Sequence, residues 1–281
     1  MNIGVVGQGY VGTAVKTIFE KYYNTNTFDL NGNCTCPTLE DLVEHSDIIF
    51  VCLPTPMNLN GSCNFSIVED VVKDINQYTN NNKVVAIKST IPPGTTADLD
   101  KKYKNINIVF NPEFLTEANF IDDFKNQNRI IIGGKKSVNS TLSEVYSPVF
   151  PDASIIETES TIAEMVKYFT NTFLATKVSF ANEMKMLCDE LKVNYHKVVE
   201  YATYDNRLGK SHWAVPGPDG KLGFGGSCFP KDINALAYIC KQLDISANVI
   251  FSAIATNLMV RPEKDWEELK GRAVVDENKD V

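Results

Sequence analysis

Short runs of β-branched, apolar residues alternate with amphipathic stretches through the first half of this chain. The apolar runs have the length of strands and occupy residues 3–6, 48–53, 84–87, 106–110 and 130–132. The amphipathic stretches occupy residues 11–21, 39–44, 65–78 and 138–146. Runs that are apolar throughout are typical of parallel strands buried on both faces. This alternation predicts an α/β fold with a Rossmann-like, doubly wound parallel sheet.

The pattern changes after residue 157. Residues 160–191 contain neither glycine nor proline, and their apolar side chains recur at helical spacing. We predict a single helix of about 45 Å, at about 1.5 Å per residue, with Thr161 and Glu164 as a capping box. Because a small domain does not need so long a helix, we expect it to form a spine or a dimer interface.

Three segments follow from this change of pattern. Residues 1–158 are predicted to form a nucleotide-binding domain, and residues 159–260 an all-helical central domain. The predicted parts of the central domain are the long helix, a short helix over 195–202, a loop over 206–229, a helix over 230–243 and a last helix that ends near residue 260. Residues 261–281 are predicted to be a charged tail with almost no core residues.

Composition limits the possible partners. The net charge of −8 argues against a nucleic acid or an anionic membrane as the main partner, and no apolar run approaches the roughly 18 residues of a membrane span. The N-terminus lacks the basic start and apolar core of a signal peptide, so we expect a cytoplasmic protein. The seven cysteines are odd in number and irregular in spacing, which predicts free thiols and no metal site.

A glycine-rich loop follows the first predicted strand and opens the first predicted helix. Its G-x-G-x-x-G pattern is formed by Gly7, Gly9, Tyr10, Val11 and Gly12, with Gln8 between the first two glycines. Glycine permits the tight turn and the close approach of backbone to a pyrophosphate, which the helix N-terminus attracts. Asp29 stands about 20 residues further on, where a carboxylate binds ribose hydroxyls and repels a 2′-phosphate. We therefore predict NAD rather than NADP as the cofactor.

Polar residues follow two predicted strands directly. The segment from Lys88, which includes Thr90, follows one strand, and the segment that contains Glu113 and Glu117 follows the next. Open α/β sheets bind their ligands at the carboxyl ends of strands, although ordinary solvated loops are a competing interpretation. Glu113 and Glu117 stand four residues apart and share one face if their segment is helical.

Lys167 and Asn171 stand four residues apart on the predicted long helix, which makes their side chains neighbours on one face. Lys167 lies at the edge of the apolar stripe. The helix alone favours a structural interpretation, in which the lysine extends its ammonium from that edge into water.

The stretch GFGGSCFPKD, residues 223–232, places a cysteine behind a glycine-rich turn and before a helix. The helix dipole and Lys231 are both expected to lower the pKa of the Cys228 thiol, and the resulting thiolate is a strong nucleophile. Asp232, in the first turn of the same helix, is expected to orient a water molecule or balance charge. A small, buried hydrophobic cysteine is the competing interpretation.

Together these motifs resemble those of the UDP-glucose 6-dehydrogenase family. The motifs GQGYVG, VCLPTP, KSTIPPGTT, NPEFLTEA, VKYFTNTFLA and GFGGSCFPKD occur in that family's order, and the likeness covers residues 1–255. The resemblance implies oxidation of the C6 alcohol of UDP-glucose to the acid with two NAD, through a thiohemiacetal and a thioester on cysteine. It also implies a homodimer.

The resemblance assigns a role to each matching residue. Cys228 is the nucleophile, and Lys167 and Asn171 stabilise the negatively charged oxygen. Water and protons are handled by Asp232, Thr90 and Glu113. The residues expected on the nicotinamide side of the cofactor are Thr55, Thr90, Glu117 and Lys231. The residues expected to contact the sugar nucleotide are Glu113, Phe114, Leu115, Glu117, Lys167, Asn171, Gly225 and, from a partner subunit, Arg207.

This chain departs from the family's pattern in two places. The family has an arginine shortly after the position of Asp29, where this chain reads Asn31-Gly32-Asn33-Cys34. Family members also carry a third domain that closes over the UDP, and we expect this chain to be a short form without it. Two alternatives stay open: the same chemistry on GDP-mannose or a UDP-hexosamine, and a catalytically silent protein that binds NAD or a sugar nucleotide.

Overall fold

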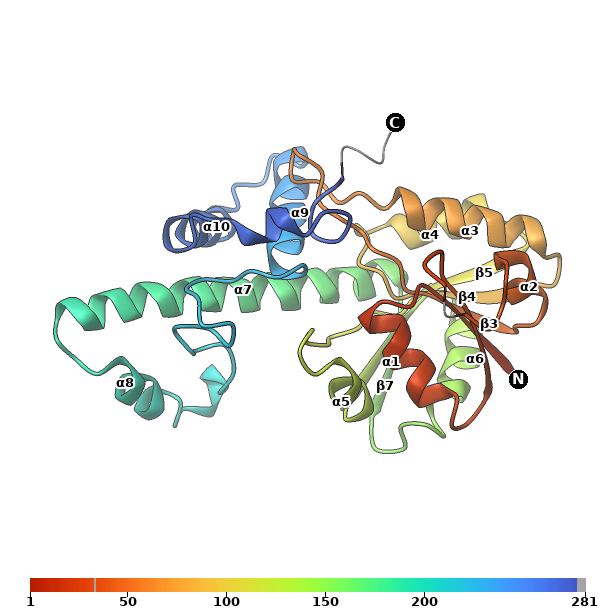
Figure 1. Ribbon diagram of the computed structural model, residues 1–281, viewed down its shortest axis with the longest axis horizontal. Coiled ribbons are helices and arrows are strands. Elements are labelled where there is room, and N and C mark those ends of the chain that lie inside the picture. The colour runs from red at the N-terminus through yellow and green to blue at the C-terminus, as the bar shows by residue number, and fades with distance from the viewer. Residues whose placement is uncertain (33, 277–281) are drawn as a thin grey trace. The chain divides into compact units, whose positions relative to one another are not determined.

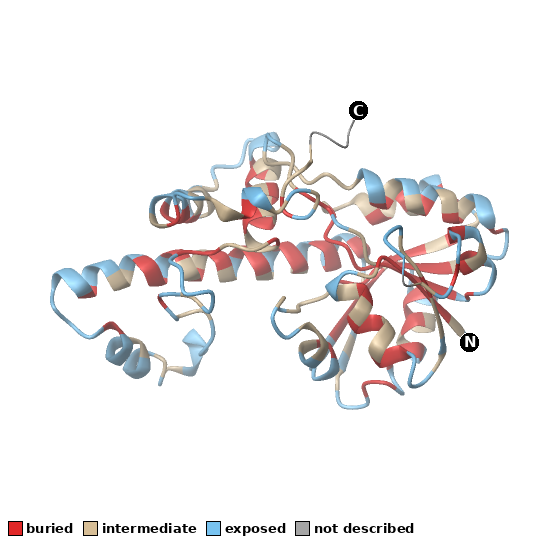
Figure 2. Ribbon diagram, viewed as in Figure 1, coloured by how far each residue is buried: buried red, intermediate tan, exposed pale blue. Residues whose placement is uncertain are grey.

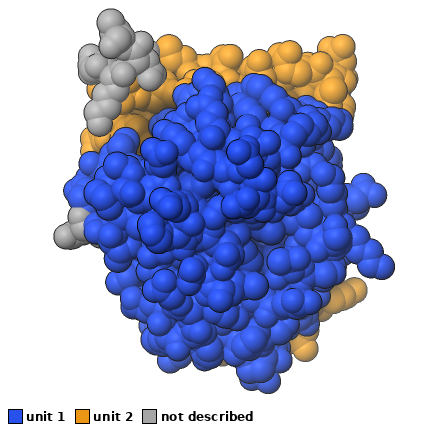
Figure 3. Space-filling view, turned by 90° about the vertical axis from the view of Figure 1, so that its right-hand side faces the viewer, with its two compact units in different colours: residues 1–55, 65–167 blue, residues 56–64, 168–281 orange. Residues whose placement is uncertain are grey.

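The computed structural model describes residues 1–32 and 34–276, which form two compact units. Unit 1 comprises Met1–Thr55 and Phe65–Lys167, and unit 2 comprises Pro56–Asn64 and Tyr168–Val281. Figure 3 shows the two units in different colours. Asn33, beside the position of the missing arginine, and residues 277–281 of the predicted tail lie outside the described residues.

Unit 1 contains one sheet (Figure 1). Its strands are ordered β2-β1-β3-β4-β5-β6-β7. The strands are β1 (Asn2–Val6), β2 (Asn24–Phe28), β3 (Ile48–Val51), β4 (Lys83–Ile87), β5 (Ile106–Phe110), β6 (Arg129–Gly133) and β7 (Ser154–Thr158). The pairs from β2 to β5 are parallel, which confirms the predicted doubly wound fold. The strand order reverses between β1 and β3, where sheets of this kind bind their ligands.

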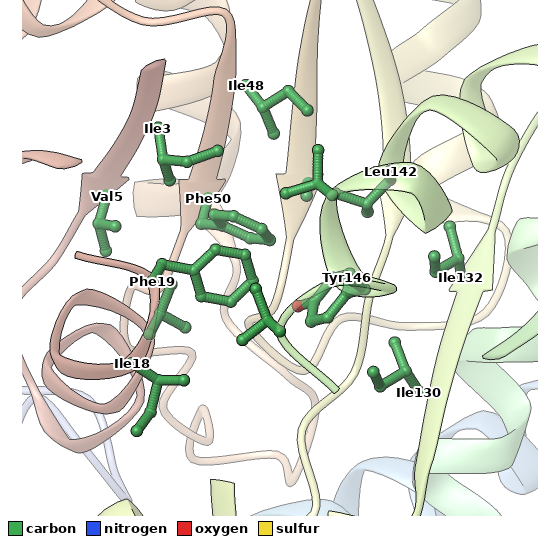
Figure 4. Close-up of a cluster of buried hydrophobic side chains, with 14 of the residues drawn as sticks. Ile3, Val5, Ile18, Phe19, Ile48, Phe50, Ile130, Ile132, Leu142 and Tyr146 are labelled. Carbon is green, nitrogen blue, oxygen red and sulfur yellow. The ribbon is translucent and has the colours of Figure 1, made fainter. Parts of the chain in front are cut away.

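Helices cover both faces of this sheet. They are α1 (Tyr10–Phe19), α2 (Leu39–Glu44), α3 (Ser66–Tyr78), α4 (Thr95–Lys102), α5 (Phe120–Lys125) and α6 (Lys136–Tyr146). One core cluster packs Phe19 of α1 and Tyr146 of α6 against Phe50 of β3 (Figure 4). The Phe19 and Tyr146 rings meet edge to face at 5.3 Å. A second cluster on the other face contains Val51 and Ile87. The central strands β3, β4 and β5 are mostly apolar because both faces are covered.

The structure differs from the predicted sheet at its two edges. β2 and β7 were not predicted, because their sequences NTNTF and SIIET lack continuous apolar runs. The side chains of these two edge strands are less completely covered, so fewer of them need to be apolar. In addition, β6 pairs with β5 in the antiparallel direction, so the sheet is not wholly parallel.

Unit 2 is helical, and its main element is the predicted long helix. This helix, α7 (Ser160–Glu190), is continuous, with the residues up to Lys167 in unit 1 and the rest in unit 2. The other helical elements are α8 (Tyr195–Ala202), η1 (Asn206–Leu208), α9 (Phe229–Gln242), α10 (Asn248–Val260) and η2 (Asp265–Glu268). A small core joins Ala175 of α7, Phe224, Ile233 of α9 and Ala253 of α10. Figure 2 shows buried and exposed residues alternating along α7.

The predicted core-free tail is wrong for residues 261–276. Arg261 and Trp266 are buried, and Ala273 is fully inaccessible to solvent. The Ala273 carbonyl accepts a hydrogen bond from the Met57 backbone at 2.9 Å. A few well-placed side chains thus bury a segment whose composition is mostly polar. Within the described part of the chain, no helix is both long and apolar enough to cross a bilayer.

Candidate active site

The glycine loop after β1 has the geometry that a bound pyrophosphate requires. Gly7 has a φ of +89°, and a Cβ there would lie 2.4 Å from the carbonyl oxygen of Cys52, which follows β3. A Cβ at Gly12 would lie 1.8 Å from the carbonyl oxygen of Gly7. Side chains are therefore excluded at both positions, and α1 begins at Tyr10 with Gly9 as its N-cap. This cradle at a helix N-terminus fits a dinucleotide phosphate.

Asp29 lies directly beside this loop. One carboxylate oxygen accepts a hydrogen bond from the backbone N–H of Gln8 at 2.6 Å, and the other accepts one from Asn31 at 2.8 Å. The Gly7 N–H also donates to the carbonyl of Phe28, at the end of β2. The end of β2 and the glycine loop thus form one connected structure, as the motif spacing predicts.

A buried lysine links the segments that follow β4 and β5. Lys88 is 3 % exposed, and its Nζ donates to the backbone carbonyl and the side-chain oxygen of Asn111, at 3.2 and 3.0 Å. The Tyr146 hydroxyl donates to the same side-chain oxygen of Asn111 at 2.5 Å. Burial lowers the pKa of Lys88 to about 8. Thr90, two residues further on, is also buried.

We predict that Lys88→Met removes a pH dependence of stability. Between about pH 8 and 10.5 the unfolded chain keeps a proton on Lys88 that the folded chain has released, so this group makes the protein more stable as pH rises. The difference in free energy of unfolding between wild type and variant should change by about 3 kcal/mol over that window, in favour of wild type at high pH.

Urea titrations at several pH values measure this difference. Burial raises the pKa values of Cys52 and Tyr146, but both groups are present in wild type and variant, so their titration largely cancels. Lys101→Met, at an exposed position of α4, is the control and should give a flat difference. A flat difference for Lys88→Met as well contradicts the prediction.

Lys167 does not reach water, so the interpretation of a lysine extended into solvent is wrong. Its side chain is 3 % exposed, and its Nζ donates to the carbonyl of Glu113 at 2.6 Å and to the carboxylate of Glu113 at 2.9 Å. Burial raises the pKa of Glu113, but Lys167 and the Leu115 N–H together lower it below its ordinary value. The result is a buried, charged pair at the carboxyl end of β5.

The segment around this pair is not helical. Residues 111–116 have no regular structure and the next helix, α5, begins at Phe120, so the shared helical face proposed for Glu113 and Glu117 does not exist. Instead, the Phe114 ring has the Lys167 ammonium 5.5 Å from its centroid. Thr55, after β3, is buried in the same unit.

Glu164 has a role in unit 1 that the sequence does not predict. Its carboxylate is fully buried and accepts hydrogen bonds from the N–H groups of Gly94 and Thr96, at 2.6 and 2.8 Å, and from the Thr96 hydroxyl at 2.6 Å. Glu164 therefore caps α4, and the capping box predicted with Thr161 is wrong. A fully buried acid three residues before Lys167 ties the segment that contains Thr90 to the start of α7.

In unit 2, three predicted residues form a buried polar cluster at the start of α9. The Asn171 amide donates to one Asp232 oxygen at 2.6 Å, and the Lys231 ammonium donates to the other at 2.5 Å. Burial lowers the pKa of Lys231, but Asp232 and the nearby thiols of Cys228 and Cys63 raise it well above its ordinary range. The lysine is thus a permanent cation beside Cys228.

Cys228 is the N-cap residue of α9, as predicted, with Pro230 in the first turn. Its carbonyl accepts a hydrogen bond from the Asp232 N–H at 3.0 Å, and its thiol is half-buried. The helix N-terminus and the Lys231 cation both favour a thiolate here. A cysteine that serves only as packing has no need of these neighbours.

The glycines before Cys228 have structural causes of their own. A Cβ at Gly223 would lie 2.3 Å from the Asn257 side-chain oxygen, and a Cβ at Gly225 would lie 2.4 Å from an Arg261 nitrogen. Arg261 was not a predicted site residue, since it falls in the predicted tail. The predicted Arg207 is largely exposed and pairs with Asp205.

Comparison with known proteins identifies the family to which this sequence is similar. Residues 24–150 match the model of the UDP-glucose/GDP-mannose dehydrogenase family, NAD binding domain, and residues 161–258 match that family's central domain. A UDP-glucose 6-dehydrogenase of Rickettsia prowazekii is 35% identical over 217 residues, which cover 75% of this chain and 49% of the relative. The Bacillus subtilis UDP-glucose 6-dehydrogenase TuaD is 33% identical over 91% of this chain and 62% of its own length.

A solved structure shows the same likeness. A UDP-glucose dehydrogenase from the hyperthermophilic archaeon Pyrobaculum islandicum superposes with a TM-score of 0.83 at 28% identity, over 92% of this chain and 68% of that one. This chain thus spans about half to two thirds of the length of these relatives. Its two matched segments are the NAD-binding and central domains, in the family's order. The chain therefore belongs to the UDP-glucose/GDP-mannose dehydrogenase family.

Proposed function

We propose that this protein oxidises the C6 alcohol of UDP-glucose to the carboxylate, with two NAD per sugar. The observation that carries the proposal is the buried cluster of Asn171, Lys231 and Asp232 at the start of α9, the helix whose N-cap residue is Cys228. NAD, when bound, accepts a hydride in each of the two oxidations. Packing alone gives no reason to bury an ammonium, a carboxylate and an amide beside a thiol.

Cys228 supplies the covalent step. Its thiolate adds to the carbonyl carbon of the aldehyde, and the oxygen takes a proton to give a thiohemiacetal. Loss of a hydride and a proton converts this adduct to a thioester, from which water releases the acid and the free thiol. We assign Asp232 to hold a water molecule, and the Lys231 cation beside the thiol favours its ionised form.

Negative charge develops on the sugar oxygen in each step, and fixed donors stabilise it best. Lys167 and Asn171, one turn apart on α7, are our candidates for these donors. Glu113, which Lys167 holds, and Thr90 exchange protons with substrate or water. We assign Thr55, Thr90, Glu117 and Lys231 to the nicotinamide side, and Glu113, Phe114, Leu115, Glu117 and Gly225 to the sugar nucleotide.

NADH formation with a panel of nucleotide sugars tests the proposal. UDP-glucose is expected to give the highest kcat/KM and two NADH per sugar. A preference for GDP-mannose or a UDP-hexosamine would keep the chemistry and change the substrate. No NADH with any sugar, together with measurable NAD binding, would support a catalytically silent protein instead. The cytoplasmic location stays a prediction.

Asp29 is expected to determine the choice of cofactor. Its carboxylate stands beside the phosphate loop, where it repels a 2′-phosphate, so wild type should bind NADH at least about 10-fold more tightly than NADPH. Asp29→Ala should reduce this preference, chiefly by weakening NADH binding. Fluorescence titration measures both affinities, and Asp70→Ala, on the exposed face of α3, is the control. Equal affinities in wild type contradict this role.

We also propose a homodimer that uses α7. Phe169 and Phe173 are 69% and 60% exposed on this helix, and their rings stack at 6.4 Å. The Asp205 carboxylate pairs with Arg207 in η1, from which Arg207 would reach a partner subunit's substrate. Sedimentation of wild type and a Phe169→Asp/Phe173→Asp variant tests this, and a wild-type monomer excludes it.

A further inference from the structure

The segment 261–276, which we call the C-terminal strap, follows the part of the chain that matches the central domain of the family. That match ends at residue 258. The strap is nevertheless anchored in unit 2 by two buried side chains, Arg261 at 2% exposure and Trp266 at 4%. Because the strap is mostly polar, it forms no core of its own. Its role therefore has to be inferred from the residues that it contacts.

Arg261 binds the loop that precedes Cys228. Its guanidinium donates to both oxygens of Asp265 within the strap, at 2.8 and 2.6 Å. The same group donates to Asp219 at 2.7 Å and to the carbonyl of Leu222 at 3.3 Å, and both of these belong to the loop. A buried guanidinium is stable only when its donors are paired. Here the pairing is divided between strap and loop.

Gly225 lies flat against this guanidinium. A Cβ at Gly225 would stand 2.4, 2.6 and 2.9 Å from Nη2, Cζ and Nε of Arg261, so only glycine permits the contact. Lys221 adds a second link, with its ammonium 2.8 Å from Asp265. The loop is thus held at Asp219, Lys221, Leu222 and Gly225, all of which precede Cys228 by fewer than ten residues.

The far end of the strap contacts the residue before Cys228. A guanidinium nitrogen of Arg272 lies 3.5 Å from the hydroxyl of Ser227, the residue before Cys228. The backbone of Met57 donates to Ala273 at 2.9 Å and accepts from Val275 at 3.0 Å. The two ends of this segment therefore contact the loop at Asp219 and Leu222 and the residue before Cys228.

We propose that Arg261 is a positioning residue, which clamps the loop 217–226 and so holds Cys228 at the N-terminus of α9. The use of Cys228 in sugar oxidation rests on the proposed function. Its placement by Arg261 does not, because the contacts above concern the folded chain alone.

A double-mutant cycle tests the clamp itself. Gly225→Ala should lower Tm by about 5 °C or more, because the added methyl overlaps the guanidinium. The methionine side chain is flexible and uncharged. In an Arg261→Met background, Gly225→Ala should therefore lower Tm by less than half as much. Equal losses in both backgrounds would show that Gly225 does not depend on Arg261, and would overturn the proposal.

Alkylation of Cys228 tests the positioning without relying on turnover. Iodoacetamide labelling followed by peptide mass analysis reports the rate at this thiol against pH. Arg261→Met should move the midpoint of the profile upward by about one pH unit, since the thiol leaves the helix N-terminus and Lys231. Lys270→Met removes an exposed cation from the same strap and is the matched control; its profile should stay that of wild type.

Asp219→Asn is a second, milder variant, which keeps the test decisive if Arg261→Met fails to fold. It keeps the pair of Arg261 with Asp265 inside the strap and weakens only the bond to the loop, so it should shift the profile in the same direction by a smaller amount. A wild-type profile in folded Arg261→Met and Asp219→Asn proteins rejects the positioning role. Shifted profiles without NADH formation by wild type would reject the proposed function and keep this inference.

Discussion

Replacing Cys228 with serine is expected to stop release of the sugar acid, with steady-state NADH formation reduced on the order of 10³-fold or more. The first oxidation, from alcohol to aldehyde, does not need the thiol and should remain detectable as a slow or partial first turnover. The acid cannot form by the same route, because the serine hydroxyl is not ionised at neutral pH and its alkoxide is a much poorer leaving group than a thiolate.

Rapid-quench experiments with UDP-glucose measure this, with NADH and the carboxylate counted separately. Wild type should give two NADH for each carboxylate. Cys240→Ser, a buried cysteine in the last turn of α9, is the matched control and should keep the two-to-one ratio. One NADH and a free aldehyde from wild type would rule out the thioester.

The second large effect is expected at Lys167. Lys167→Met keeps the length of the side chain and removes the ammonium, so kcat should fall about 10²–10³-fold, the usual loss for one fixed oxyanion donor. KM for NAD should change little, because the glycine loop and Asp29 are untouched. Steady-state kinetics provide the measurement, and Lys185→Met, further along α7 and paired with Asp189, is the control.

Stability measurements identify the cause of any loss in this variant. Without Lys167, Glu113 keeps its burial but loses its main counter-charge, so its pKa should rise above the ordinary value. A carboxyl with a raised pKa in the folded state stabilises at low pH and loses that contribution as pH rises. The Tm of Lys167→Met should therefore increase from pH 7 to pH 5 relative to wild type. Adding Glu113→Gln should remove this difference, and normal kcat in the folded variant contradicts the role of Lys167.

The fold was predictable where residues are buried on both sides. Continuous apolar runs identified β1, β3, β4, β5 and β6, and the absence of glycine and proline identified α7. The edges were not predictable, because one-sided packing leaves NTNTF and SIIET without a distinct pattern. Direction also escaped prediction, since apolar runs do not indicate that β6 pairs antiparallel to β5.

In the candidate site, too, local motifs were predictable, whereas contacts between distant segments were not. Motif spacing was enough to place the glycine loop beside Asp29 and Cys228 at a helix start. The helix pattern alone gave Lys167 the wrong environment, because its partner Glu113 comes from a segment 54 residues away in sequence. Arg261 was missed for a similar reason. A single arginine in a polar segment does not predict a buried ion pair, because its partner Asp219 is distant in sequence.

The pairing of Met57 with Ala273 has a consequence for the order in which the protein is made. The ribosome releases the segment Pro56–Asn64 early, yet its backbone partner Ala273 is synthesised roughly 10–40 s later, at about 5–20 residues per second. All strands of unit 1 have emerged well before then. During that interval the backbone N–H and carbonyl of Met57 lack their partners Ala273 and Val275 and bond to water instead. Unit 2 therefore acquires these two hydrogen bonds only after residues 273–275 have been made, whereas the residues of every strand in unit 1 are available earlier.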